Sequence, residues 1–337
     1  MVTRADRYVY SADDGRYENM SYRRVGNSGL KLSAFSLGFW HNYGSSCDFE
    51  NMKKMCRTAF DNGITSFDLA NNYGPVYGSA EENFGRILES DFRPYRNEMV
   101  ISSKAGYDMW AGPYGAGGSR KYLIASCDES LKRLKLDYVD LFYHHCMDKE
   151  TPVEETVEAL NLLVLQGKAL YVGISNYNKE YTQRAKEYAD SIHCPLIIQQ
   201  RRFSIFDRSV ADDGTLDYCE QNGIGEIAFS PLAQGLLSDR YIHGIPEDSR
   251  IAKDHRFLHR EDLTEERLSQ IRHLNDLAAQ RGQSLPEMAL EWLLSHNAVT
   301  SVIIGASKPE QILNNIKALN GPALTAEELA LIDSISR

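Results

Sequence analysis

The sequence predicts an α/β fold, a single closed (β/α)8 barrel of the TIM type, and two observations predict it. Eight short apolar runs recur along the chain, and each is followed by a stretch in which apolar residues repeat with a helical period. Strands that alternate with helices at intervals of roughly 30 residues need crossover connections and therefore form a parallel sheet. Eight such units without a break in composition fit one closed barrel better than an open, doubly wound sheet.

The expected strands are runs of aliphatic, aromatic and β-branched residues. They cover residues 35–39, 64–69, 99–103, 138–143, 169–174, 196–199, 225–229 and 300–304. Between them, Ser or Thr followed three residues later by Glu predicts helix starts, because the two side chains cap each other's backbone amides. The pairs are Ser79/Glu82, Thr151/Glu154, Ser284/Glu287, Ser307/Glu310 and Thr325/Glu328.

Several segments lie outside the eight units. Residues 22–32 predict a small β-hairpin that covers the barrel floor. Residues 1–20 are polar and are expected to form a tail, which leaves residues 21–337 as one domain with extra helices toward its C-terminal end. Residues 230–261 show no clean period and are expected to form a long loop on the active face.

The composition excludes several classes of protein. The chain has 337 residues, 37 Lys and Arg against 47 Asp and Glu, and a net charge of −10, which disfavours nucleic acid and anionic membranes as partners. No apolar run reaches the roughly 18 residues that a membrane span needs, so we expect a cytoplasmic protein. No metal is expected, because His255 and His259 lack the Glu of an H-E-x-x-H motif.

Polar residues follow the expected strands where the strands of a parallel barrel converge. The second strand ends in Asp68 and is followed by Tyr73, the third ends just before Lys104, and the fourth ends in His144 and His145. A lysine held by an aspartate can lower the pKa of a tyrosine, and a neutral histidine can orient a carbonyl toward that phenol. Each residue alone is more often structural, but together they predict a proton-donating site. A reduction there would need a nicotinamide cofactor, because no side chain supplies a hydride.

These residues resemble the motifs of the aldo-keto reductase family. Residues 67–74 (FDLANNYG) are similar to its D-x-A-x-x-Y-G motif, residues 101–104 (ISSK) to its lysine strand, and residues 139–145 (VDLFYHH) to its histidine strand. The resemblance implies a barrel that binds NADPH without a Rossmann fold. It assigns Tyr73 as the acid, Asp68 and Lys104 as the residues that tune it, and His145 rather than His144 as the residue that orients the carbonyl.

The resemblance also implies the residues that bind NADPH or NADP+. The segment around Ser175 would hold the carboxamide, Phe229 would stack on the nicotinamide, and the following loop would cover the pyrophosphate. Ser307 precedes a helix whose N-terminus is an anion site in its own right, suited to the 2′-phosphate. The residues so implied are Gly38, Trp40, Ser175, Asn176, Gln200, Phe229, Ser230, Pro231, Leu232, Gln234, Gly235, Arg240, Arg250, Gly305, Ser307, Gln311, Asn314 and Asn315.

Within the family, the chain is most similar to the branch that holds L-glyceraldehyde 3-phosphate reductases and potassium channel β subunits. This implies a homo-oligomer that reduces small aldehydes, with L-glyceraldehyde 3-phosphate and methylglyoxal among the candidates. Trp40, Trp110 and Phe203 are expected to wall the substrate pocket, and Arg201 or Arg202 to attract a substrate phosphate.

Two alternatives remain open. The chain resembles channel subunits closely enough to be a cofactor-bound regulatory or adaptor subunit with slow redox chemistry, although those subunits carry Asn at the position of His145. Thiol chemistry at Cys146 is the second alternative, and it is disfavoured because neighbouring residues on a strand point to opposite faces.

Overall fold

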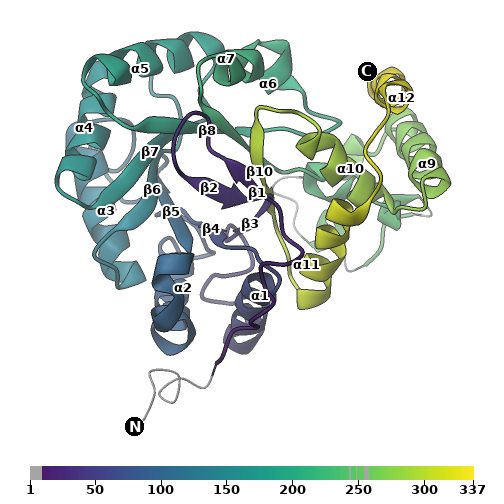
Figure 1. Cartoon of the computed structure of the whole chain (residues 1–337), viewed down its shortest axis with the longest axis horizontal. Helices are drawn as coiled ribbons and strands as arrows, with labels where there is room; N and C mark the ends of the chain where they lie inside the picture. The colour runs from purple at the N-terminus through teal and green to yellow at the C-terminus, as the bar shows by residue number, and fades with distance from the viewer. Residues whose placement is uncertain (1–9, 243, 248, 254–257) are drawn as a thin grey trace.

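The computed structural model describes residues 10–242, 244–247, 249–253 and 258–337. Its central feature is a closed barrel of eight parallel strands, in the order β10-β3-β4-β5-β6-β7-β8-β9 (Figure 1). The strands are β3 (Phe35–Gly38), β4 (Ser66–Asp68), β5 (Val100–Ala105), β6 (Val139–His144), β7 (Ala169–Ser175), β8 (Leu196–Arg202), β9 (Gly225–Phe229) and β10 (Val299–Ile304).

The predicted (β/α)8 barrel is therefore confirmed, and every expected strand coincides with an observed one. The largest differences in length from the expectation are at two strands. Strand β4 has three residues, and β8 continues to Arg202 because its last residues still pair with β9. The longer β8 brings additional polar residues to the mouth of the barrel.

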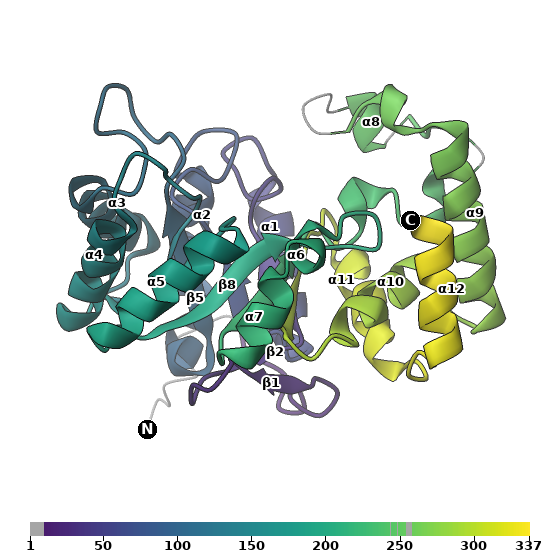
Figure 2. The same ribbon diagram turned by 90° about the horizontal axis from the view of Figure 1, so that it is seen from above.

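Helices surround the barrel, and one group extends beyond it. The α-helices are α1 (Phe49–Asp61), α2 (Ser79–Ile87), α3 (Arg120–Leu134), α4 (Val153–Leu165), α5 (Lys179–Ser191), α6 (Ser209–Asp212), α7 (Thr215–Gln221), α8 (Arg250–Lys253), α9 (Glu265–Gln280), α10 (Leu285–Leu294), α11 (Pro309–Ile316) and α12 (Ala326–Ser336). Figure 2 shows α9 and α12 side by side, away from the strands. These are the extra C-terminal helices.

The barrel floor is closed by the predicted hairpin of β1 (Tyr22–Arg24) and β2 (Lys31–Ser33). Val25 and Leu32 are completely buried, and they belong to one apolar cluster with interior barrel residues such as Leu141. Gly26 has φ +48°, and a β-carbon there would lie 1.9 Å from the carbonyl oxygen of Gly223, so only glycine fits this approach.

Residues 10–20 pack against the barrel rather than extending from it. Tyr10, Ala12 and Met20 are buried, and the Tyr10 hydroxyl donates to Asp61 Oδ1 at the end of α1 (2.6 Å). Residues 1–9 of the expected tail lie outside the described residues, and the division of the chain at residue 21 stays a prediction.

Two of the five expected capping boxes form, at Ser284/Glu287 and Thr325/Glu328. The other three predictions were wrong, because α2, α4 and α11 begin after Gly78, Pro152 and Lys308. In each case the hydroxyl has another partner. These contacts are Ser79 Oγ with Val76 O, Thr151 Oγ1 with Asp148 Oδ2, and Ser307 Oγ with Gln311 Oε1.

The expected active-face loop at 230–261 contains short helical segments instead of one long irregular chain. Besides α8, it holds η4 (Ala233–Gly235), η5 (Asp239–Tyr241) and the start of η6 (Arg260–Asp262). The other short segments of this kind are η2 (Leu88–Phe92), η3 (Arg93–Glu98) and η7 (Lys317–Asn320). His255, which was named with His259 in the sequence as lacking a metal-binding motif, lies outside the described residues.

None of the helices in the described ranges combines the length and apolar character that a bilayer crossing requires.

Candidate active site

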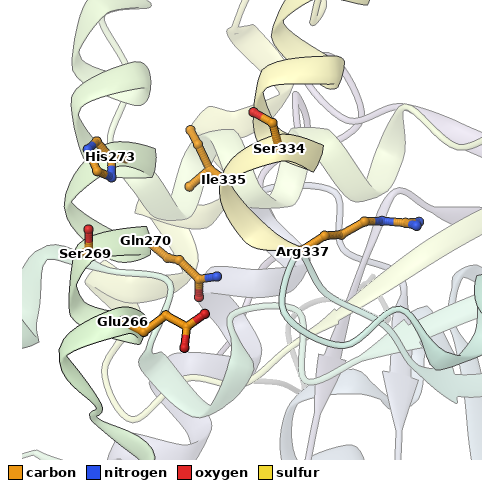
Figure 3. A pocket seen from close by; sticks show the side chains of 7 residues that line it. All are labelled: Glu266, Ser269, Gln270, His273, Ser334, Ile335 and Arg337. Carbon is orange, nitrogen blue, oxygen red and sulfur yellow. The ribbon is translucent and has the colours of Figure 1, made fainter.

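A cavity of about 1600 Å³ opens at the carboxyl ends of the barrel strands. It runs from Asp68 and Tyr73, past Phe229 on β9, to the start of α11. A second hollow of about 500 Å³ lies between α9 and the end of α12 (Figure 3). It is lined by Glu266, Ser269, Gln270, His273, Ser334, Ile335 and Arg337, none of which was expected at the site. The cavity at the strand ends is therefore the candidate active site.

Lys104 forms a buried ion pair at the base of this cavity. Its side chain has no solvent exposure, and its Nζ lies 2.7 Å from Asp68 Oδ2. The same amine donates to Leu69 O (2.6 Å) and to Tyr73 Oη (3.3 Å). Burial lowers the pKa of Lys104, and the charge of Asp68 opposes that fall. The ammonium thus has three acceptors, one of which is the phenol.

Asp68 is held from two further directions. Its Oδ1 accepts hydrogen bonds from Ser102 Oγ on β5 and from Gln200 Nε2 on β8, both at 3.0 Å. Hydrogen bonds to a carboxylate favour its charged form, which offsets the cost of burying it. Three strands therefore fix the carboxylate that holds Lys104.

Tyr73 lies in the loop after β4, and its ring centroid is 5.7 Å from that of His145. Removal of the phenol from water raises the pKa of Tyr73 well above its usual value, and the charges of Asp68 and Tyr107 act in the same direction. The expectation that Lys104 lowers this pKa was wrong. The reason is that Asp68 neutralises the ammonium at 2.7 Å, so the removal of the phenol from water outweighs the lysine.

His145 lines the cavity, whereas His144 does not. His144 is the last residue of β6 and pairs its Nδ1 with Tyr177 Oη at 2.6 Å, on the outer side of the strand. Burial and the charge of Lys104 hold the pKa of His145 well below its usual value, so its ring is neutral. The strand register that favoured His145 over His144 thus agrees with the positions of the two side chains.

Most residues expected to contact the cofactor line this single cavity. They are Gly38, Trp40, Asn176, Gln200, Phe229, Ser230, Pro231, Leu232, Gln234, Gly235, Arg240, Gly305, Ser307, Gln311, Asn314 and Asn315. Ser175 is completely buried and donates to Gln200 O (2.9 Å), so it supports the lining from behind. The side chain of Arg250 lies outside the described residues.

The residues present fit a dinucleotide. The cavity exceeds the roughly 300–1000 Å³ typical of small-molecule sites. Its lining includes the aromatic ring of Phe229, and also Ser307 and the N-terminal turn of α11. An aromatic platform joined to an anion-binding helix start is what a nicotinamide ring and its phosphates require.

Of the three residues expected to wall the substrate pocket, one lines the cavity and two do not. Trp40 lines the cavity. Trp110 is 40% exposed on the loop after β5 and packs against Tyr122, with ring centroids 5.1 Å apart. Phe203 is completely buried against Trp292 and is absent from the lining, because the chain turns inward just after β8 ends.

Tyr107 and Lys317 also line the cavity, although neither was expected there from the sequence. The Tyr107 ring lies 4.7 Å from that of His145, and its hydroxyl accepts from Asn176 Nδ2 at 3.5 Å. Its position three residues after Lys104, beyond a strand end, could have indicated it. Lys317 follows α11.

The geometry does not support thiol chemistry at Cys146. Burial and the carboxylates of Asp148 and Asp108 raise the pKa of this thiol to about 11. A thiol rather than a thiolate is a weak nucleophile at neutral pH.

The closed parallel barrel thus brings Tyr73, Lys104, Asp68 and His145 together at its mouth. The sequence profile of the "Aldo/keto reductase family" matches residues 34–337. The chain belongs to the aldo/keto reductase family.

The chain is also similar to individual proteins and to a solved structure. The chain is 55% identical over 328 residues to an "L-glyceraldehyde 3-phosphate reductase" of Escherichia coli O157:H7, covering 96% of this chain and 95% of that protein. It is 36% identical over 323 residues to a "Probable voltage-gated potassium channel subunit beta" of Arabidopsis thaliana, covering 94% and 96%. The crystal structure of the thermostable aldo-keto reductase Tm1743 with the inhibitor epalrestat is similar, with a TM-score of 0.74, 30% identity, and coverage of 94% and 100%.

Proposed function

We propose that this protein reduces small aldehydes with NADPH and that Tyr73 is the general acid. The observation that carries this proposal is the hydrogen bond from Lys104 Nζ to Tyr73 Oη, 3.3 Å long, inside a dinucleotide-sized cavity that His145 also lines. The relatives named as L-glyceraldehyde 3-phosphate reductases support this phosphorylated triose as a substrate. The proposal includes the cytoplasmic location and homo-oligomeric assembly expected from the sequence.

The chain's own residues account for the proton transfer. Bound NADPH supplies the hydride. An aldehyde oxygen between Tyr73 and His145 accepts the phenolic proton as negative charge develops on it, while neutral His145 orients the carbonyl. Lys104 then donates to the phenolate that remains, and Asp68 keeps Lys104 charged. Because burial raises the pKa of Tyr73, the phenol holds its proton at neutral pH until the alkoxide forms.

The proposed preference for NADPH over NADH is based on the residues that line the cavity near α11. Ser307 and Gln311 line the cavity at the first turn of α11, whose N-terminal cap is Lys308. A hydroxyl and free helix amides together favour a phosphate group. Lys317, at the other end of α11, lines the same cavity. Arg240 lines the same cavity from η5.

The test is oxidation of NADPH in the presence of 4-nitrobenzaldehyde and of glyceraldehyde 3-phosphate. We expect turnover by the wild type, and a fall in kcat of at least about 100-fold for Tyr73→Phe, which removes only the acidic hydroxyl. NADPH affinity, followed by quenching of protein fluorescence, should stay within about threefold. Tyr114→Phe is the matched control, since Tyr114 is exposed outside the cavity. Unchanged turnover in Tyr73→Phe would remove this residue from its role.

The channel-subunit relatives favour a second candidate function, that of a cofactor-bound adaptor. A turnover rate too low for metabolism, together with a membrane protein that copurifies, would support it. Turnover at an ordinary enzymatic rate would support the reductase.

A further inference from the structure

Two adjacent arginines at the end of β8 occupy different environments. Side chains alternate along a strand, so Arg202 lies on the same side as Gln200, and Arg201 lies on the other. Arg201 donates to Tyr177 O (2.7 Å) and to Asp213 Oδ2 (2.9 Å), and its side chain is only 13% exposed. The guanidinium of Arg201 is therefore already paired with groups of the protein itself.

Arg202 is available for a ligand. Its side chain is 55% exposed and lines the cavity, and its closest carboxylate contact in the described part of the chain is a loose one, with Asp207 Oδ2 at 3.9 Å from Nε. An ion pair as open as this one contributes little, so an anion can replace it at small cost. More than half of the Arg202 side chain is therefore exposed, on a residue that lines the cavity.

Arg202 also lies near the aromatic ring that is expected to stack on the nicotinamide. Its guanidinium carbon is 5.9 Å from the ring centroid of Phe229. Burial raises the pKa of Tyr107, and the charge of Arg202 opposes that rise. The Tyr107 ring in turn lies 4.7 Å from that of His145.

We propose that Arg202 is the specificity-determining residue for an anionic group on the substrate, a phosphate or a carboxylate a few bonds from the aldehyde. This rests on the proposed function, which places the carbonyl at Tyr73 and His145. Arg202 follows Gln200, the partner of Asp68, by two strand residues, about 7 Å. That spacing suits a short aldehyde bound at both ends, and a guanidinium binds the oxygens of phosphate or carboxylate in pairs.

Steady-state kinetics on paired aldehydes tests the proposal. The pairs are glyceraldehyde 3-phosphate with glyceraldehyde, and succinic semialdehyde with butanal. In Arg202→Gln we expect the ratio of kcat/KM for the anionic to the neutral aldehyde to fall about 10- to 100-fold, the range for lost hydrogen bonds between charged groups. The Arg202→Lys variant should retain part of the ratio. The pair that shows the larger fall identifies the anion as phosphate or carboxylate.

Arg272→Gln is the matched control, because Arg272 is exposed on α9 outside the cavity lining. It should leave both ratios unchanged. A ratio that is the same in Arg202→Gln and the wild type would overturn the proposal. So would a rise in the KM for NADPH without a change in the ratio, since Arg202 would then bind the cofactor.

Calorimetry with glycerol 3-phosphate, which carries the phosphate but no aldehyde, separates this proposal from the reductase activity. We expect binding to wild-type protein in the presence of NADP+ and about 10-fold or more weaker binding to Arg202→Gln. If the wild type oxidised NADPH with none of the aldehydes but showed this loss of binding, the proposed function would fail and the role of Arg202 would stand. Equal binding by both proteins would overturn the role of Arg202.

Discussion

Lys104 Nζ and Asp68 Oδ2 lie 2.7 Å apart in the barrel interior, where the side chain of Lys104 has no solvent exposure and that of Asp68 only 5%. The pair sits directly beneath the phenol of Tyr73. Water cannot solvate a buried charge that has lost its partner. The ion pair therefore contributes both to the stability of the fold and to the chemistry of the site.

We therefore expect Lys104→Met to lower the free energy of unfolding by about 3–5 kcal/mol, because it leaves Asp68 buried and charged without its cation. Urea denaturation of the cofactor-free protein measures this. The double variant Asp68→Asn/Lys104→Met should recover part of the loss. Lys135→Met, which breaks the exposed pair with Glu89, should cost no more than about 1 kcal/mol. Equal losses in both single variants would contradict the role of burial.

The pH dependence of kcat should be flat from about pH 6.5 to 9.5. Burial raises the pKa of Tyr73 above its usual value near 10, so the acid stays protonated over this range. His145 stays neutral, because its pKa is held well below its usual value near 6.5. Aldehyde reduction at saturating NADPH gives the profile, and circular dichroism at each pH confirms that the protein remains folded. A loss of activity with a midpoint below pH 9 would show that the phenol is more acidic than its burial implies.

Acid should destabilise the fold through His144. Burial lowers its pKa to about 4, whereas in the unfolded chain it takes up a proton near pH 6.5. The unfolded state binds more protons between these values, so stability falls as the pH falls, by roughly 3 kcal/mol at pH 4. Urea denaturation across this range should show a shallower pH slope for His144→Gln than for wild type. The exposed His273→Gln variant is the control and should keep the wild-type slope.

Gly173→Ala should overpack the barrel interior. A β-carbon at this position of β7 would lie 2.5 Å from Tyr143 Cε1 and 2.6 Å from Ile198 Cγ2, both fully buried. Overpacking of this kind costs about 1–3 kcal/mol, measurable as a lower thermal midpoint. Gly29→Ala is the control, since a β-carbon there meets nothing within 4 Å. A midpoint as high as that of the control would mean that Tyr143 can move.

The strands could be predicted from the sequence because a barrel strand is packed on both sides and reads as a continuous apolar run. Strand β6 is an example, because all of its residues are buried and Leu141, Phe142 and Tyr143 are consecutive in it. Asp68, Lys104 and His145 could be singled out because each lies at the end of a strand, and Tyr73 because it lies in the loop that follows one. Position along a strand also indicated which histidine faces the cavity.

Other features depend on contacts between distant segments, which spacing alone does not reveal. Ser79 and Thr151 have the spacing of capping residues, but their hydroxyls bond to Val76 and Asp148 instead. Phe203 follows a barrel strand, yet Trp292 from α10 covers it. The pKa of Tyr73 depends on how much water the surrounding loops exclude, and this outweighs its lysine neighbour.

The hairpin and the candidate site lie at opposite ends of the barrel. Val25 and Leu32 are completely buried in the apolar cluster at the floor, whereas the cavity opens at the carboxyl ends of the strands. Substitutions in the hairpin should therefore change the stability of the barrel and leave the chemistry at its mouth unchanged.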